Sequence, residues 1–261
     1  MRKTAPKPAR VAASFGRNAH AYETHAELQR MVAAKLAASL PQLEAPKVLE
    51  LACGTGLFSR YLLAEYPDGD FTFSDLSKGM LAEAKRNIAH IGTAPRRFVE
   101  VDANAPGDLE RYDLIATSMS LHWLADPAAS LQALRAHLKP GGALVYAGLG
   151  ENCFAEWRAA LAAEGLPDGI VPLPPLPGVK DSEALVMEQD GLAFLRRLKA
   201  IGGITPAEGY RSLPPGALRR ALRRLERSHG GKVTWEIVYG RLSSMESSLA
   251  ASRSSPSMMP L

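Results

Sequence analysis

The chain has 261 residues, 46% of them hydrophobic, and a formal net charge of +4, which suffices for one large domain or for one domain with an inserted lid. No apolar run approaches the roughly 20 residues that cross a bilayer, and no apolar segment of a secretory signal follows the basic N-terminus, so we expect a cytoplasmic protein without membrane contact. The two cysteines form no metal-ligand pattern and the basic residues lack interleaved aromatic residues, so we expect neither a metal nor nucleic acid as a partner.

The first part of the chain predicts a helical cap followed by alternating strands and helices. Residues 1–10 are expected to be disordered and residues 11–45 to form the cap, with Leu28, Val32 and Leu36 on one helical stripe. Residues 46–165 should form a ligand-binding core of parallel strands with helices on both faces. The expected strands are 47–52, 70–75, 96–101, 112–118 and 143–148, and the expected helices follow Gly56, span 78–91 after Ser77, start at Asp126 and span 151–164.

The second part is expected to cover and complete the sheet. A Pro-rich loop spans 167–178, a short strand lies near 183–188, and two leucine-lined helices precede a last strand at 233–239. Residues 166–242 should therefore contain lid helices and the last strands of the sheet. The Ser- and Met-rich residues 243–261 predict a disordered tail.

Three acids mark the carboxyl ends of three successive predicted strands. Glu50 opens the motif Glu50-x-Ala52-x-Gly54-x-Gly56, and Asp75 and Asp102 end the next two strands. Ligands of open α/β sheets bind in the crevice beyond these strand ends, and the glycines bend the backbone and expose bare peptide. Asp75 would accept the ribose hydroxyls of an adenosine, Asp102 its amino group, and Glu50 would face a cationic tail. This constellation indicates S-adenosylmethionine.

A nicotinamide dinucleotide is the alternative ligand for such a glycine turn. Dinucleotide folds favour G-x-G-x-x-G, whose third glycine eases helix–strand packing, but Ser59 occupies the third position here. A pyrophosphate gains nothing from a carboxylate beside the turn, and Glu50 would add negative charge there. The residues therefore favour the methyl donor.

The segment from Glu50 to Asp102 resembles the class I S-adenosylmethionine-dependent methyltransferases, and the turn Leu138-Lys-Pro-Gly-Gly142 matches that class as well. The resemblance implies a Rossmann-like α/β fold with a seven-stranded, mostly parallel sheet, an antiparallel last strand, a helical N-terminal cap and a helical insertion before the last strand. Cys53 is expected to pack as a small residue rather than to attack substrate. The implied cofactor-binding residues are Glu50, Ala52, Cys53, Gly54, Gly56, Asp75, Leu76, Met80, Asp102, Ala103 and Ser118.

The N-terminal segment contains Phe15-Gly-Arg17, Ala21-Tyr22-Glu23 and His25-Ala26-x-Leu28-Gln29. With these features it resembles a narrower family, the malonyl-[acyl-carrier protein] O-methyltransferases, which open pimelate synthesis for biotin. The resemblance implies methyl transfer to the free carboxylate of a malonyl thioester, carried by acyl-carrier protein or coenzyme A. A carboxylate is ionised at pH 7, so the reaction needs no general base, and catalysis is positioning. The resemblance continues in Leu198-Lys-Ala-Ile201-Gly202.

The substrate site is expected to combine a cation with aromatic walls. An arginine fork holds a carboxylate bidentately, and Arg17 and Arg211 are the candidates for orienting the malonyl carboxylate. Tyr22 is a site residue by resemblance, although its ring could equally pack under the N-terminal helix. Trp123, which follows the fourth strand, either contacts cofactor or substrate or belongs to the core.

A basic helix at 218–227 and two other functions complete the set of hypotheses. The helix has only Glu226 as a nearby acid, and its basic face is either simply solvated or steers an acidic carrier protein.

A methyltransferase for another small acid or phenol would share the core but not the N-terminal segment. The run Met119-Ser-Leu-His122-Trp123 also resembles respiratory complex I assembly factors of the same fold, some of which hydroxylate a client protein. A monomer is compatible with the sequence. The arginines of the basic helix are Arg219, Arg220, Arg223, Arg224 and Arg227.

Overall fold

The computed structural model describes residues 5–187, 190–201 and 205–244, without the side chains of residues 17, 18 and 21. Within these ranges, no helix combines the length and apolar composition of a membrane span. The helices are α1 Pro8–His25, α2 Glu27–Ala37, α3 Ser59–Glu65, α4 Lys78–Asn87, α5 Pro127–Arg135, α6 Ala155–Ala163, α7 Gly191–Ala200 and α8 Pro215–His229, with a short 3-10 helix, η1, at Leu121–Trp123. The strands are β1 Lys47–Leu51, β2 Asp70–Asp75, β3 Arg96–Glu100, β4 Tyr112–Ser118, β5 Leu138–Leu149, β6 Val179–Val186 and β7 Thr234–Ser243.

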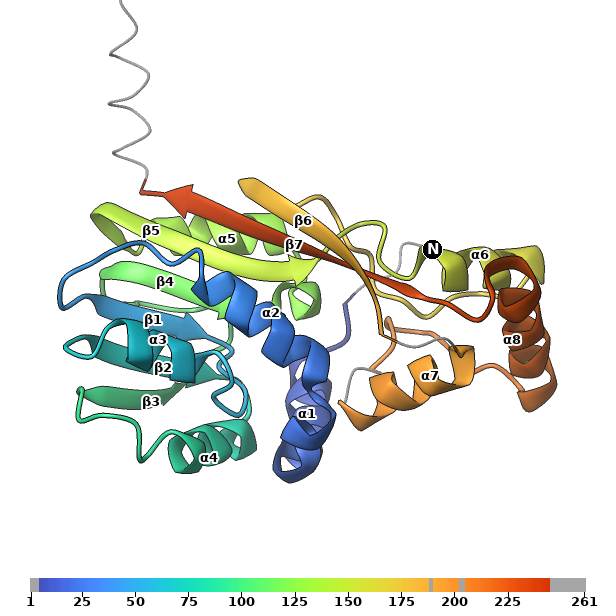
Figure 1. Cartoon of the computed structure of the whole chain (residues 1–261), viewed down its shortest axis with the longest axis horizontal. Helices are drawn as coiled ribbons and strands as arrows, with labels where there is room; N and C mark the ends of the chain where they lie inside the picture. Colours follow the sequence, from blue (N-terminus) through green and yellow to red (C-terminus); the bar gives the residue numbers. More distant parts are fainter. Residues whose placement is uncertain (1–4, 188–189, 202–204, 245–261) are drawn as a thin grey trace, which may run out of the picture.

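The seven strands form one sheet in the order β3-β2-β1-β4-β5-β7-β6 (Figure 1). β1 pairs in parallel with β2 and β4, β2 with β3, and β4 with β5. β7 is antiparallel to both of its neighbours, β5 and β6. The predicted mostly parallel sheet with an antiparallel last strand is therefore confirmed. The strand order reverses between β1 and β4, so the carboxyl ends of these strands flank the crevice where such sheets bind ligands.

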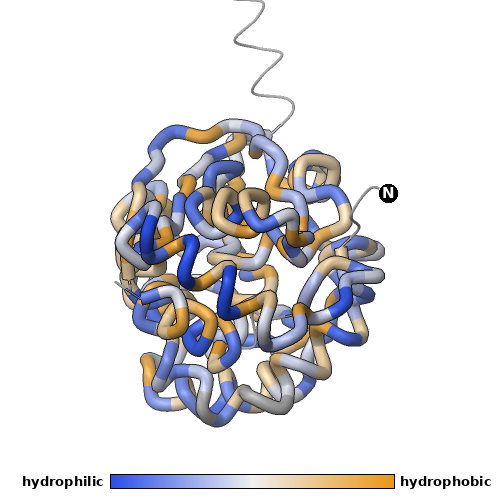
Figure 2. The backbone as a smooth tube through the Cα atoms, turned by 90° about the vertical axis from the view of Figure 1, so that its right-hand side faces the viewer, coloured by the Kyte–Doolittle hydropathy of each residue, from blue (hydrophilic) through white to orange (hydrophobic). Residues whose placement is uncertain are grey.

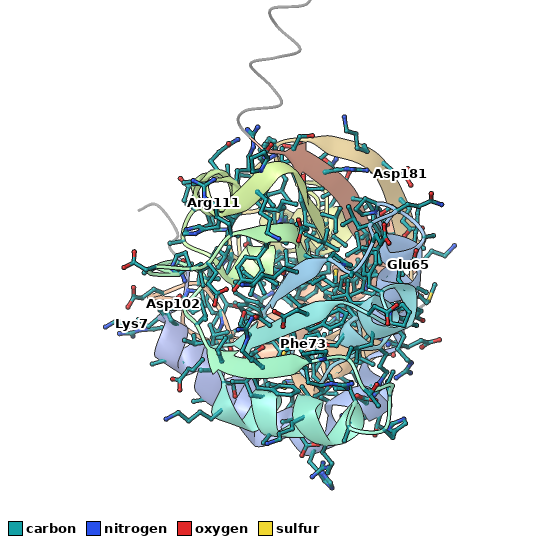
Figure 3. All side chains as sticks on the ribbon, turned by 90° about the vertical axis from the view of Figure 1, so that its left-hand side faces the viewer. Lys7, Glu65, Phe73, Asp102, Arg111 and Asp181 are labelled. Carbon is teal, nitrogen blue, oxygen red and sulfur yellow. The ribbon has the colours of Figure 1, made fainter. Side chains whose placement is uncertain are left out.

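The central strands are buried on both faces. α2, α3 and α4 pack on one face and α5 on the other, which explains why these strands are nearly continuous apolar runs. Phe73 of β2 lies in the interior (Figure 3), stacked on Phe71 at a ring-centroid distance of 5.6 Å. Local signals predicted the starts of two helices correctly: Ser77 Oγ accepts from Met80 N at the start of α4, and Asp126 Oδ1 accepts from Ala129 N at the start of α5.

The chain ends are more ordered than predicted where the structure describes them. α1 begins at Pro8, inside the stretch expected to be disordered, because a proline suits a first helical turn, where its missing N–H is not needed. The cap divides into two helices at Ala26, which is completely buried. At the other end β7 continues to Ser243, and the next amide donates to the carbonyl of Gly142. Residues 1–4 and 245–261 lie outside the described residues.

Two strands begin earlier than predicted. β5 begins at Leu138 instead of residue 143, because the turn before it already pairs with β4 through an irregular register beside Tyr112. β6 begins at Val179 instead of residue 183, and its first residues are exposed along the sheet edge. An edge strand of this kind has no apolar run by which a sequence would reveal its start.

α6, α7 and α8 form a lobe at one end of the sheet (Figure 1). Its centre is an aromatic cluster in which the ring of Phe154 lies 4.6 Å from that of Trp235 and 5.1 Å from that of Phe194. The charge of the basic helix, α8, is partly neutralised by Glu164 at the end of α6, which pairs with Arg220 at 3.4 Å and with Arg224 at 3.2 Å. The expectation that Glu226 is the only acid near this helix was therefore wrong, because helix packing brings Glu164, which is distant in the sequence, into contact with α8.

Candidate active site

Three cavities meet where α1 crosses the carboxyl ends of the strands. The strand-end cavity, about 120 Å³, lies between α1 and the ends of β1, β2 and β4. The inner cavity, about 40 Å³, lies behind the glycine turn, next to α2. The lobe cavity, about 190 Å³, lies between the cap, the lobe and the 169–173 loop. The strand-end and inner cavities share Ala52, Gly54, Tyr22 and Ser118.

The strand-end cavity collects most of the predicted cofactor residues. Asp102 and the start of α1 lie at the same edge of the molecule (Figure 3). Asp102 Oδ1 accepts from both nitrogens of Asn104 at 2.9 Å, which orders the loop after β3. The predicted cofactor residues in this cavity are Ala52, Gly54, Asp75, Leu76, Met80, Asp102, Ala103 and Ser118.

Gly54 and Asp75 form the floor of this cavity. Gly54 has φ +57°, and a Cβ built on it would meet nothing within 4 Å, so bare peptide faces open space. Its amide donates to Asp75 Oδ2 at 3.0 Å, and the amide of Ser77 donates to Oδ1 at 2.8 Å. Each carboxylate oxygen keeps a second lone pair for a ligand hydroxyl. This geometry fits a ribose above the turn.

Glu50 lies in the inner cavity as a buried acid without a cation. Its side chain is 1% exposed and accepts a hydrogen bond from Ser59 Oγ. Burial raises the pKa of Glu50 to about 8, with a further contribution from the charge of Asp75. Among the described residues no lysine or arginine pairs with it. A ligand carrying an ammonium group would supply the missing charge, so the site fits a cationic tail.

Gly56 and Cys53 have packing roles. Gly56 lines none of the three cavities, so its expected contact with the cofactor is not found. Its φ of +89° and a Cβ position 3.0 Å from Ile88 Cγ2 show that glycine is needed there for close approach to α4. Cys53 lines the inner cavity and is buried, and its burial raises the pKa of the thiol well above the usual value. The thiol is therefore un-ionised and unsuited to nucleophilic attack.

Tyr22 lines all three cavities. Its ring lies 6.1 Å from that of Phe15, which in turn lies 5.5 Å from the ring of Trp123 in an edge-to-face contact. Burial, with the charges of Asp75 and Glu23, raises the pKa of Tyr22 far above its usual value. The hydroxyl is therefore protonated at every ordinary pH and can donate a hydrogen bond at the junction.

Comparison with known proteins identifies the family. Residues 49–144 match the family described as a methyltransferase domain. The chain is 34% identical over 247 residues to the malonyl-[acyl-carrier protein] O-methyltransferase of Magnetococcus marinus, with 88% of this chain and 91% of the relative covered. The chain belongs to the malonyl-[acyl-carrier protein] O-methyltransferase family. It is also 38% identical over 244 residues to the biotin biosynthesis bifunctional protein BioCD of Bordetella avium, of which it spans about half, 51%, with 88% of this chain covered.

Solved structures agree on the fold of this family member. The YcgJ protein from Bacillus subtilis superposes with a TM-score of 0.58 at 12% identity, covering 82% of this chain and 98% of its own. Coclaurine N-methyltransferase, solved with N-methylheliamine and SAH, has a TM-score of 0.54 at 12% identity, covering 84% of this chain and 73% of its own. These likenesses show the methyltransferase fold.

The expected cation of the malonyl-[acyl-carrier protein] O-methyltransferase site is not found in the described structure. Arg211 is exposed in the loop before α8 and lines none of the three cavities. The described structure therefore does not bring Arg211 to the cavities, and its pairing with the malonyl carboxylate stays a prediction. Arg17 lies in α1, but its side chain is outside the described residues. Trp123 lines both the strand-end and the lobe cavities, and its contact with cofactor or substrate stays a prediction.

Several lining residues escaped the sequence prediction for this family member. Phe15 and Gln29 stand in the motifs that revealed the family, so their position there was an available signal. Met119 and Phe154 have left-handed φ values of 56° and 62°, which cost energy for residues with a Cβ and tend to occur at functional sites. No local pattern marks such strain. The missed residues lining the lobe cavity include Phe15, Gln29, Met119, His122, Phe154, Trp157 and Trp235.

Proposed function

We propose that this protein transfers the methyl group of S-adenosylmethionine to the free carboxylate of a malonyl thioester on acyl-carrier protein, an early step of biotin synthesis. The observation that carries the proposal is the junction at Tyr22, where a cavity lined by Asp75 and Asp102 meets a largely apolar one. The family relationship and the names of the relatives support the substrate. A cytoplasmic setting belongs to the proposal, since both cysteines are free thiols buried in the core.

The strand-end and inner cavities would hold the methyl donor. Asp75 would accept the ribose hydroxyls above Gly54, Asp102 would face the adenine amino group, and Glu50 would pair with the ammonium. The bound donor supplies a sulfonium methyl group. Bound in this way, the donor would present its reactive methyl at the Tyr22 junction, toward the lobe cavity.

The malonyl group would enter from the lobe cavity, already ionised. The donor held by Glu50, Asp75 and Asp102 would supply its methyl group to one carboxylate oxygen, with the electron pair of the broken carbon–sulfur bond going to sulfur, so no proton would have to move. The products are a methyl ester and a neutral thioether. The chain's contribution is alignment and exclusion of water by the aromatic side chains of Phe15, Tyr22 and Trp123.

The carrier would dock on the lobe. α8 lies at the end of the molecule that faces the viewer in Figure 2, where hydrophilic and hydrophobic stretches of tube alternate. Arg220 and Arg224 are paired with Glu164. The other three arginines of the helix are exposed, and no ion pair involving them is found among the described residues. These are Arg219, Arg223 and Arg227. An acidic carrier protein is complementary to such a face.

The test is a parallel methylation assay. The protein is incubated with methyl-labelled S-adenosylmethionine and malonyl-, acetyl- or succinyl-acyl-carrier protein. We expect label on the malonyl carrier alone. Label on none of the three would contradict the proposed activity, and label on the acetyl carrier would contradict the carboxylate as acceptor.

A further inference from the structure

The lobe cavity gathers buried polar atoms that lack partners. Four buried side-chain polar atoms of the described residues have no hydrogen-bond partner, and three of them belong to residues lining this cavity: Gln29 Oε1, His122 Nδ1 and Trp235 Nε1. Gln29 is 9% exposed and Trp235 is 2% exposed. A buried polar atom left unpaired carries its whole desolvation penalty. Three such atoms on side chains that line one cavity indicate a polar ligand.

The same cavity offers no charged group to that ligand. None of its described lining residues is an aspartate, glutamate, lysine or arginine. Most of the wall is aromatic or aliphatic, with Phe154 and Trp157 from the lobe and Phe15 from the cap. Any anion bound here would therefore meet neutral hydrogen-bond donors instead of an ion pair.

The three side chains share the capacity to donate. The indole N–H of Trp235 only donates. Burial lowers the pKa of His122 to about 4, so the imidazole is neutral at pH 7 and one of its tautomers donates from Nδ1. The amide of Gln29 presents its NH₂ group in place of its oxygen after a half-turn, an orientation that hydrogen bonding decides. Their common ligand is a group with acceptor oxygens only.

We propose that Trp235, His122 and Gln29 form a neutral hydrogen-bonding receptor for the malonyl carboxylate, in the role that an arginine would otherwise have. The inference rests on the proposed function and names the residues that select its substrate. It replaces the expected pairing of the carboxylate with Arg17 or Arg211.

A neutral receptor suits this reaction better than a cation. Methyl transfer turns a carboxylate of charge −1 into a neutral ester. An arginine would stabilise the substrate more than the transition state, which slows the chemical step, and would remain as an unpaired buried cation beside the ester. Neutral donors pair with the ester oxygens as well, and the apolar wall excludes water that would solvate the nucleophile.

The experiment measures selectivity between two small probes by calorimetry. Malonyl-pantetheine and acetyl-pantetheine are titrated into the full chain saturated with S-adenosylhomocysteine, so that no turnover occurs. Trp235→Phe, His122→Phe and Gln29→Leu should each lower the ratio of malonyl to acetyl affinity by about threefold to thirtyfold. Binding of S-adenosylhomocysteine to Trp235→Phe and His122→Phe should change by less than about twofold, and retention of that binding shows that these two variants are folded. Gln29 also lines the inner cavity, so thermal unfolding checks the fold of Gln29→Leu.

Trp157→Phe is the matched control. It removes an indole N–H from the same cavity, at an atom that is not among the unpartnered ones, so it should alter both probe affinities by the same factor. An unchanged ratio in all three receptor variants would overturn the inference, as would an Arg17→Gln variant that no longer prefers malonyl over acetyl. If the unmodified protein itself shows no preference for malonyl, the proposed function fails as well. The two failures are therefore distinguishable.

Discussion

Ser59 Oγ donates a 2.5 Å hydrogen bond to Glu50 Oε2 inside the core, and this bond ties the first residue of α3 to β1 across the glycine turn. It favours the ionised carboxylate, but burial outweighs it, so the pKa of Glu50 still rises to about 8. A strand-end acid kept protonated in the free protein is costly to ionise and ready to pair with a cation. Two predictions depend on this pair.

Replacing Glu50 should change how stability depends on pH. The folded-state pKa of about 8 exceeds the usual 4.5, so the folded protein keeps a proton that the unfolded chain loses. The stabilising contribution is complete below the unfolded pKa and is lost as pH rises through 8. Glu50→Gln should therefore unfold with a free energy about 2–4 kcal/mol higher than wild type at alkaline pH, and nearly equal at acidic pH. Urea unfolding without ligand measures this, and parallel pH profiles for the two proteins would contradict it.

Ligand binding should release a proton from Glu50. A bound ammonium favours the carboxylate, so a group that is largely protonated at pH 7 ionises on binding. Calorimetry with S-adenosylhomocysteine in two buffers of different ionisation enthalpy measures the proton count. Wild type should release close to one proton more than Glu50→Gln, whose affinity should also be lower. Equal counts in the two proteins would show that Glu50 does not face the ammonium.

The two glycines of the turn should respond differently to alanine. At Gly54 the added methyl enters the strand-end cavity, so Gly54→Ala should weaken S-adenosylhomocysteine binding at least about tenfold while costing only about 1 kcal/mol of stability for the left-handed backbone. At Gly56 the methyl would lie 3.0 Å from Ile88 Cγ2. Gly56→Ala should therefore cost about 2–3 kcal/mol, from strain and overpacking together. Thermal unfolding and ligand titration on both variants decide this, and identical profiles would contradict the assignment.

Removing the hydroxyl of Tyr22 should slow the reaction without loosening the fold. Tyr22→Phe keeps the ring beside Phe15 but removes the donor at the junction, so kcat should fall about fivefold to tenfold, the worth of one hydrogen bond. The rate loss should be the same across neutral and mildly alkaline pH, because the hydroxyl does not ionise there. Steady-state kinetics with malonyl carrier protein test this. A full-rate Tyr22→Phe enzyme would assign the residue to packing alone.

Charge reversal on α8 should separate carrier docking from chemistry. Arg219→Glu combined with Arg223→Glu should raise KM for malonyl carrier protein about tenfold or more and leave malonyl-coenzyme A turnover unchanged. A double reversal of Lys85 and Lys180, two exposed lysines outside the lobe, is the control of equal charge and should leave both substrates unaffected. Equal losses with carrier and coenzyme A would rule out docking on this helix.

Much of the site could be predicted because its signals are local. Gly54 and Asp75 occur at a strand end and in a tight turn, where sequence spacing dictates three-dimensional spacing. Trp235 could not be assigned to the site in this way, because the sequence pattern of an alternating strand does not distinguish an aromatic site residue from an aromatic core residue. Arg211 lines none of the three cavities, and the sequence could not indicate this, because an arginine in a loop carries no local signal of which side the loop will expose.

The sequence alone determined the alternating strands and helices, the order of the cofactor motif and the family. Those properties depend on periodicity, capping and turn chemistry within a few residues of one another. Only the tertiary structure decided that Gln29, His122 and Trp235, from α2, η1 and β7, line one cavity, and that Glu164, which follows α6, neutralises part of α8. Such contacts join residues far apart in the chain, and the packing of whole elements selects them.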